Sequence, residues 1–335
     1  MNTIARRLLA MIPALLGVIV CMFLITRVLP GDPARTFAGE QAPQSVIDGI
    51  RRSMGLDQPL YIQFFRYVGD LFRGDLGFAW HTGQRVVDDL ASRFPATIEL
   101  GLSALIVALL IGIPLGILSA TQRDRWVDHL SRVLSLLGAS MPVFWVGLLA
   151  IFLFFGQLHW APAPLGRISD NLNPPTHITG LYVLDSLLSG DMAALTSSVQ
   201  HLILPALVLA LGPTAIIARM TRSAMLEVIA QDYIRTATAK GLPRIIVIGK
   251  HALKNAAPVT ATIVGLQFGQ LLGGAVITET IFTWPGVGSY VTQSILATDY
   301  APVQAFTLLA AIVYLVINLL VDIVNGWLDP RVKNV

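Results

Sequence analysis

Long apolar stretches alternate with polar connecting segments along this chain. A helix that crosses a bilayer needs about 20 mostly apolar residues, and six runs reach or approach that length. The runs cover residues 8–29, 97–119, 133–156, 202–218, 258–278 and 303–324. Pro13, Pro114, Pro142 and Pro205 lie inside them, which membrane helices tolerate because neighbouring helices satisfy the freed backbone groups. The pattern predicts an all-α polytopic membrane protein with six transmembrane helices.

The first run follows Arg6 and Arg7, as in a signal peptide, but it is longer than a signal core. No small-x-small cleavage site follows it. We therefore expect it to be retained as the first membrane helix.

Lysine and arginine are distributed unevenly among the connecting segments. With the N-terminus placed in the cytoplasm, fourteen of the 23 basic residues fall on the cytoplasmic side, as the positive-inside rule requires. The two shorter external loops carry only Arg167, and the long segment 30–96 has seven basic and eight acidic residues. We therefore expect both termini to be cytoplasmic.

The chain is predicted to have three parts. Residues 1–29 form the N-terminus and first helix, residues 30–96 an extracytoplasmic segment, and residues 97–335 a five-helix core with cytoplasmic helices at about 230–256. The extracytoplasmic segment contains apolar residues at helical spacing, namely Tyr61, Phe64, Phe65, Val68, Leu71 and Phe72. This face is either a docking surface for an external partner or a surface that packs on the membrane helices.

The cytoplasmic segment 219–255 is rich in basic residues. Residues 231–240 predict a helix that Gly241 ends in the left-handed conformation. Pro243 suits the first turn of a second helix, which is expected to end near Asn255. On charge alone, the alternative is a basic loop that contacts lipid headgroups. A DNA-binding helix-turn-helix is disfavoured because both ends of the segment are tethered to membrane spans.

Composition supports a membrane protein and argues against an ordinary cytosolic enzyme. The chain is 54% apolar and 13% charged, with a mean hydropathy of +0.68, whereas a soluble domain is about 25% charged. The single Cys21 excludes an internal disulfide and a cysteine-built zinc site. The Gly249–Lys250 pair lacks the first glycine of a phosphate loop, since Arg244 stands there. We expect no ATPase activity, metal or cofactor in this chain, and no nucleic-acid partner.

Few ionisable residues lie at or inside the apolar runs. Arg27, Glu99 and Glu279 are at predicted helix ends, where their side chains are expected to snorkel into water. Asp322 is the one clearly within a run. A stand-alone secondary transporter needs a relay or cluster of such groups, so this class is a weaker alternative.

Amide side chains and a proline break predict where solute passes. Gln267 and Gln270 share one helix face, and their amide groups would lack hydrogen-bond partners in hydrocarbon. Pro142 can break the helix of the third run and expose polar backbone groups there. The candidate path residues are Met141, Phe144, Trp145, Gln267, Gln270, Asn318 and Asp322. The alternative is that these amides only hydrogen-bond neighbouring helices.

Motifs along the whole chain carry a family resemblance. Residues 232–242 are DYIRTATAKGL and residues 251–256 are HALKNA. The other motifs are PGDP at 30–33, GDLG at 74–77, FPATIEL at 94–100, GIPLG at 112–116, MPVFW at 141–145, HLILPA at 201–206, TETIFTWPG at 278–286, NLLVD at 318–322 and DPR at 329–331. Together they resemble the permeases of the dipeptide/oligopeptide/nickel group of ABC importers, specifically the B-type dipeptide subunit. Aligned on Gly241, the chain has Arg235-Thr236-Ala237 in place of the E-A-A of the wider ABC signature, and His251-x-Leu253-Lys254 in place of I-x-L-P.

The resemblance implies a location, a fold and a set of partners. It implies the type I importer fold in a bacterial inner membrane, with a sister permease, two ATPase subunits that bind ATP and Mg, and an extracytoplasmic substrate-binding protein. The implied ATPase-coupling residues are Asp232, Tyr233, Arg235, Thr236, Ala237, Lys240, Gly241, Leu242 and Arg244. The expected solutes are di- and oligopeptides. Nickel chelates, glutathione and opine-like solutes are alternatives within the family.

Overall fold

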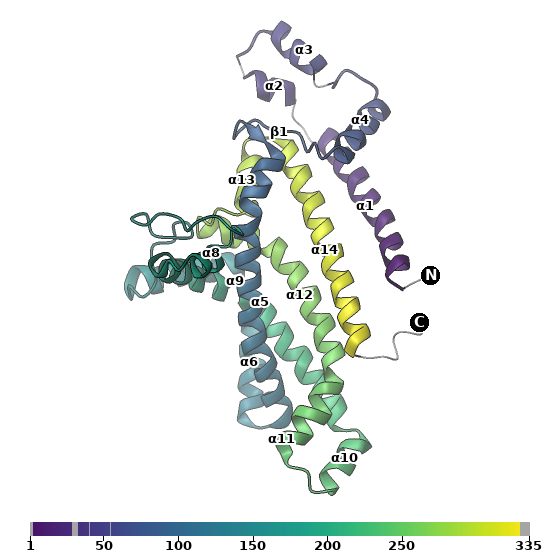
Figure 1. The fold of residues 1–335 in the computed structure, drawn as a ribbon, viewed down its shortest axis with the longest axis vertical. Helices are drawn as coiled ribbons and strands as arrows, with labels where there is room; N and C mark the ends of the chain where they lie inside the picture. The colour runs from purple at the N-terminus through teal and green to yellow at the C-terminus, as the bar shows by residue number, and fades with distance from the viewer. Residues whose placement is uncertain (1–2, 29–32, 40, 54, 329–335) are drawn as a thin grey trace. The chain divides into compact units, whose positions relative to one another are not determined.

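The computed structural model describes residues 3–28, 33–39, 41–53 and 55–328, and helices dominate these ranges (Figure 1). The chain forms two compact units. The first comprises Met1–Ala96 with Pro285–Val313, and the second comprises Thr97–Trp284 with Tyr314–Val335. Two long helices, α5 (Val86–Thr121) and α14 (Tyr300–Leu328), contribute residues to both units.

The first unit combines short helices with one small hairpin. Its other elements are α1 (Thr3–Val28), α2 (Pro33–Ala38), α3 (Gln44–Ser53), α4 (Leu60–Phe72), β1 (Phe78–Ala79), β2 (Gln84–Arg85) and α13 (Val287–Leu296). The strands pair antiparallel, with Phe78 opposite Arg85. A buried core that contains Tyr290, Leu90 and Val86 holds the hairpin, α13 and the adjoining ends of α5 and α14 together.

The second unit is a helical bundle. Besides parts of α5 and α14, it contains α6 (Trp126–Ser140), α7 (Val143–Ala150), a π-helical segment (Ile151–Gln157), α8 (Tyr182–Ser189), α9 (Met192–Ile229), α10 (Asp232–Ala239), α11 (Arg244–Ile246), a second π-helical segment (Val247–Leu253) and α12 (Lys254–Ile281). Helix α9 packs against α6, α8 and α12 (Figure 1).

Glycine permits a close helix contact in this bundle, between α5 and α9. A Cβ at Gly116 would lie 2.6 Å from the carbonyl oxygen of Ala218 and 2.7 Å from Cβ of Thr221. Real side chains do not approach backbone so closely, so a larger residue would force α5 and α9 apart.

The chain is an all-α membrane protein. Among the described residues, α5, α9 and α14 are each long and apolar enough to cross a bilayer, and two bent helix pairs raise the number of candidate spans to five. Helix α1 covers the first predicted run, but its described apolar stretch, Met11–Ile25, is shorter than a full span.

The third predicted run is not one straight helix. Its two halves, Trp126–Ser140 and Val143–Gln157, meet at an angle of 101°. Pro142 lies at the bend because proline has no N–H to donate to a continuing helix. The expected break in the helix is therefore present. Because the two halves meet at so large an angle, this run forms a broken span or a re-entrant segment rather than one straight span.

Helix ends also differ from the apolar boundaries. Helix α5 begins at Val86, inside the segment expected to lie outside the membrane, and α9 extends over 38 residues. A helix satisfies its own backbone, so polar residues can prolong it beyond the hydrocarbon. For the same reason the second cytoplasmic helix does not end near Asn255, because α11, the π-helical segment Val247–Leu253 and α12 are continuous.

Candidate coupling elbow, external surface and membrane path

A glycine elbow joins α10 to α11. Gly241 has φ +76°, the left-handed conformation that glycine adopts without strain. The Gly241 N–H donates to the Thr238 carbonyl at 3.0 Å, and the Leu242 N–H donates to the Ala237 carbonyl at 3.4 Å. These two hydrogen bonds form the Schellman arrangement that ends many helices. The helix predicted over 231–240 and its glycine stop are confirmed.

The elbow rests on a buried apolar core. Ile234 and Ala237 on α10 pack with Met225 and Val247, and all four are less than a tenth exposed. The Arg244 guanidinium donates to the Thr121 carbonyl at the end of α5, at 2.9 Å. Movement of the elbow would therefore be transmitted directly to α5 and α9.

The predicted coupling residues fall into two groups. All except Ala237 are exposed, namely Asp232, Tyr233, Arg235, Thr236, Lys240, Gly241, Leu242 and Arg244. Ala237 is only 7% exposed, so it supports the elbow by packing rather than by presenting a surface. Arg235 lies 3.7 Å from Asp232 with both side chains in solvent, where such ion pairs contribute roughly 0–1 kcal/mol.

Sequence reasoning missed a buried carboxylate beneath this region. Asp128 on α6 is fully buried and accepts hydrogen bonds from the Arg222 guanidinium on α9, at 2.7 and 2.9 Å. Ser119 on α5 donates to the same carboxylate at 2.5 Å, and Arg132 lies 3.3 Å away. Arg222, which the sequence assigned to a positive-inside signal, therefore also joins α9 to α6, and Arg132 pairs with the same carboxylate from within α6.

Two acids expected to snorkel are buried instead. Glu99 is 6% exposed and accepts from Arg167 at 2.5 Å and from the Val183 N–H at 2.8 Å. Glu279 is fully buried and accepts from the Thr97 hydroxyl at 2.6 Å. The prediction for these two residues is wrong because partners distant in sequence replace the water that snorkelling would reach. The side chain of Arg27 lies outside the described residues.

Arg167 fastens the loop before α8 to this unit. Its guanidinium also donates to the Gly180 carbonyl at 2.9 Å and lies 3.6 Å from the Tyr182 ring centroid. Nearby, Asp185 accepts from the N–H groups of Thr179 and Gly180, both at 2.8 Å. Burial raises the pKa of Asp185, but hydrogen bonds from this loop outweigh it and hold that pKa below its usual value.

Six of the seven candidate path residues lie on three helices of the second unit, and Met141 lies between α6 and α7. Gln267 is 5% exposed and donates to the exposed Gln270 at 2.9 Å, so the two amides do share a face of α12. Phe144 and Trp145 are about half exposed beyond the Pro142 bend, and Met141 precedes it. Asn318 and Asp322 are partly buried on α14. Glycine contacts bring the adjoining parts of α12 and α14 together, with Gly269 against Tyr314.

The predicted apolar face of α4 divides in two. Phe64 packs against the buried Phe23 of α1, with ring centroids 5.2 Å apart. Tyr61, Phe65 and Phe72 are 65%, 71% and 88% exposed. Successive helical residues are about 100° apart, so Phe64 and Phe65 cannot both face α1.

The motif residues 30–32 and 329–331 lie outside the described residues.

Comparison with known proteins agrees with this architecture. Residues 112–334 match the family described as "Binding-protein-dependent transport system inner membrane component", and residues 1–101 match its N-terminal counterpart. The chain is 50% identical over 331 residues to the probable D,D-dipeptide transport system permease protein DdpB of Escherichia coli, covering 99% of this chain and 97% of that protein. It is 46% identical over 329 residues to the dipeptide transport system permease protein DppB of Alkalihalophilus pseudofirmus, covering 98% of each.

A glutathione transport system permease protein, GsiC of Escherichia coli, is 38% identical over 333 residues, covering 99% of each chain. These relatives match from end to end, as do the two family models taken together. The chain therefore belongs to the family of inner-membrane components of binding-protein-dependent transport systems.

Proposed function

We propose that this chain is the permease subunit of an ATP-driven importer of short peptides. It would have six transmembrane helices in the type I arrangement and both termini in the cytoplasm. A sister permease would complete the channel, two ATPase subunits would hold ATP and Mg, and an external binding protein would deliver the peptide. The observation that carries the peptide assignment is 50% identity, over 99% of this chain, to a D,D-dipeptide permease.

The elbow at Gly241 is the proposed point of ATPase coupling. Its exposed residues lie on α10 and on the turn that follows it, while its buried residues tie these elements to α5 and α9. A rigid surface with such connections can convert closure of the ATPases into movement of the membrane helices. A basic loop that only contacts lipid would not need the supporting core.

The assignment is tested by reconstituting the permease with its sister, ATPases and binding protein in proteoliposomes. We expect ATP-dependent uptake of labelled D-Ala-D-Ala or L-Ala-L-Ala. Uptake of glutathione instead would favour the second candidate, which the relative GsiC supports. Uptake by this chain alone, driven by a proton gradient, would overturn the proposal.

The path assignment makes a labelling prediction. In a background with Cys21→Ser, Gln270→Cys should react with a charged thiol reagent in at least one transport state. Gln267→Cys should react more slowly in the resting state, because its position is 5% exposed. Leu110→Cys, 70% exposed on the apolar span α5, is the matched control and should stay unreactive because it faces lipid. Protection of both glutamine positions, resting and ATP-trapped, would remove them from the path.

Different residues of α4 test the two alternatives for its apolar face, docking of an external partner and packing on α1. Changing Phe65 and Phe72 to serine should reduce uptake from the binding protein severalfold without lowering yield, because both rings are exposed. Phe64→Ser should lower yield, because its ring packs on Phe23 and aromatic pairs contribute about 0.5–1.5 kcal/mol beyond area burial. Normal uptake by the double variant at saturating and at limiting binding protein would exclude these two rings as a docking surface.

A further inference from the structure

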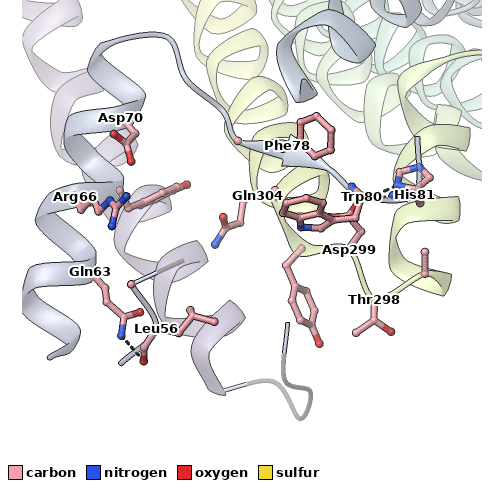
Figure 2. Close-up of a pocket in the computed structure, with 16 residues that line it drawn as sticks. Leu56, Gln63, Arg66, Asp70, Phe78, Trp80, His81, Thr298, Asp299 and Gln304 are labelled. Atoms are coloured by element: carbon pink, nitrogen blue, oxygen red, sulfur yellow. Dashed lines mark hydrogen bonds and ion pairs between the residues drawn. The ribbon is translucent and has the colours of Figure 1, made fainter. Parts of the chain in front are cut away.

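A cavity of about 500 Å³ lies within the first unit, between α4, the β1–β2 hairpin and the start of α14. Figure 2 shows Gln63, Arg66 and Asp70 on one wall, and Trp80, His81 and Asp299 on the opposite wall. Its volume falls within the range of about 300–1,000 Å³ typical of small-molecule sites. The coupling elbow and the proposed path residues take no part in it.

Asp299 is the most completely buried charged group of this cavity, at 4% exposed. Only one of its oxygens is engaged: Oδ2 accepts from the Trp80 N–H at 2.6 Å and lies 3.0 Å from His81 Nδ1. Oδ1 is buried and has no hydrogen-bond partner in the described chain. A buried carboxylate oxygen left unpaired costs free energy, so a donor that reached Oδ1 would lower that cost.

Two further unpaired atoms belong to side chains that line this cavity. Gln63 uses its amide nitrogen to donate to the Gln58 and Leu56 carbonyls, at 2.7 and 3.3 Å, which fixes the amide and leaves the buried Oε1 as an unused acceptor. When Nδ1 of His81 donates to Asp299, its buried Nε2 is also an unused acceptor. Three unused acceptors from separate elements call for a ligand that donates several N–H groups.

Arg66 supplies the opposite chemistry on the α4 wall. Its guanidinium lies against the backbone of Gly55, where an added Cβ would be 2.9 Å from Nη1. It makes no ion pair in the described chain, whereas its neighbour Asp70 lies 3.7 Å from Arg73. A planar guanidinium at the rim of a cavity binds a carboxylate well.

We propose that this cavity binds a short zwitterionic peptide, with its α-ammonium group at Asp299 and its carboxylate at Arg66. The proposal rests on the proposed peptide-import function and adds to it a binding site on the permease itself. A buried acceptor on one wall and a guanidinium on the other select for both free ends of a peptide at once. The cavity would thereby distinguish short peptides from blocked ones.

Changes to the ligand test this proposal without altering the protein. The permease pair, in lipid nanodiscs without its binding protein, is titrated with Ala-Ala, N-acetyl-Ala-Ala and Ala-Ala-amide. We expect each blocked peptide to bind at least about tenfold more weakly than Ala-Ala, as loss of one charge-assisted contact implies. Equal binding of the three peptides, or no measurable binding of Ala-Ala, would overturn the proposal.

Variants of the protein then test which residue binds the α-ammonium group of the peptide and which binds its carboxylate. Asp299→Asn should remove the preference against the acetylated peptide, and Arg66→Gln should remove only the preference against the amide. Arg73→Gln is the matched control, since Arg73 is exposed on the same segment and does not line the cavity. Preferences unchanged in Arg66→Gln would overturn the carboxylate assignment, and this variant replaces an exposed residue that makes no ion pair in the described chain.

Uptake by the complete importer separates the two proposals. If peptides are imported but the permease pair does not discriminate their ends, the cavity proposal fails and the import function stands. If the permease pair discriminates but the importer does not take up peptides, the import function fails and the cavity remains a site for zwitterions.

Discussion

Replacing Gly241 by valine is expected to abolish most ATP-coupled transport while leaving membrane insertion unchanged. The residue has φ +76°, and no other atom lies within 4 Å of the Cβ that a side chain would add. The cost is therefore conformational rather than steric crowding, at about 1–3 kcal/mol for a non-glycine residue held in this region. A β-branched side chain is among the least able to adopt it, so the Schellman hydrogen bonds would break and α10 would shift.

The measurement is the peptide-stimulated ATPase activity of the assembled complex, beside uptake. Gly241→Asn should retain much of the coupling, because asparagine tolerates the left-handed conformation better than other residues. Gly249→Val is the matched control, since Gly249 has an ordinary φ and equally open surroundings. Full stimulation in Gly241→Val would mean that this segment is a basic loop that touches lipid rather than a coupling surface.

The second large effect is expected at the buried pair of Glu99 and Arg167. Glu99→Ala should destabilise the protein by about 3–5 kcal/mol, because it leaves the guanidinium buried at 6% exposure without its carboxylate. It also removes the acceptor for the Val183 N–H, at the start of α8. We expect loss of the folded protein in detergent at temperatures where the unaltered chain survives, measured by thermal unfolding.

A double variant distinguishes a lost contact from an uncompensated charge. Glu99→Leu with Arg167→Met removes both charges and should recover a large part of the stability lost by either single variant. Arg85→Gln removes an exposed pair with Asp88 and should cost no more than about 1 kcal/mol. If Glu99→Ala were no more harmful than Arg85→Gln, the buried pair would not be what fastens the loop before α8.

The sequence by itself determined the features that depend on neighbouring residues. Apolar runs predicted the membrane helices, because a helix in lipid must be apolar over about 20 residues. Gly241 and Pro243 predicted the elbow, because left-handed backbone and a missing N–H are properties of single residues. Pro142 predicted a break for the same reason, while the angle of 101° depends on how the two halves pack.

Only the tertiary structure decided which charged groups meet. Glu99 pairs with Arg167, Asp128 with Arg222, and Asp299 with the hairpin residue His81. These partners are 68, 94 and 218 residues apart in the chain, so no local pattern links them. The orientation of Phe64 likewise depends on Phe23 of another helix. Hydropathy and glycine positions determine helices and turns because they depend on neighbouring residues only. Whether a charged side chain is buried depends instead on which distant side chain packs against it in the fold.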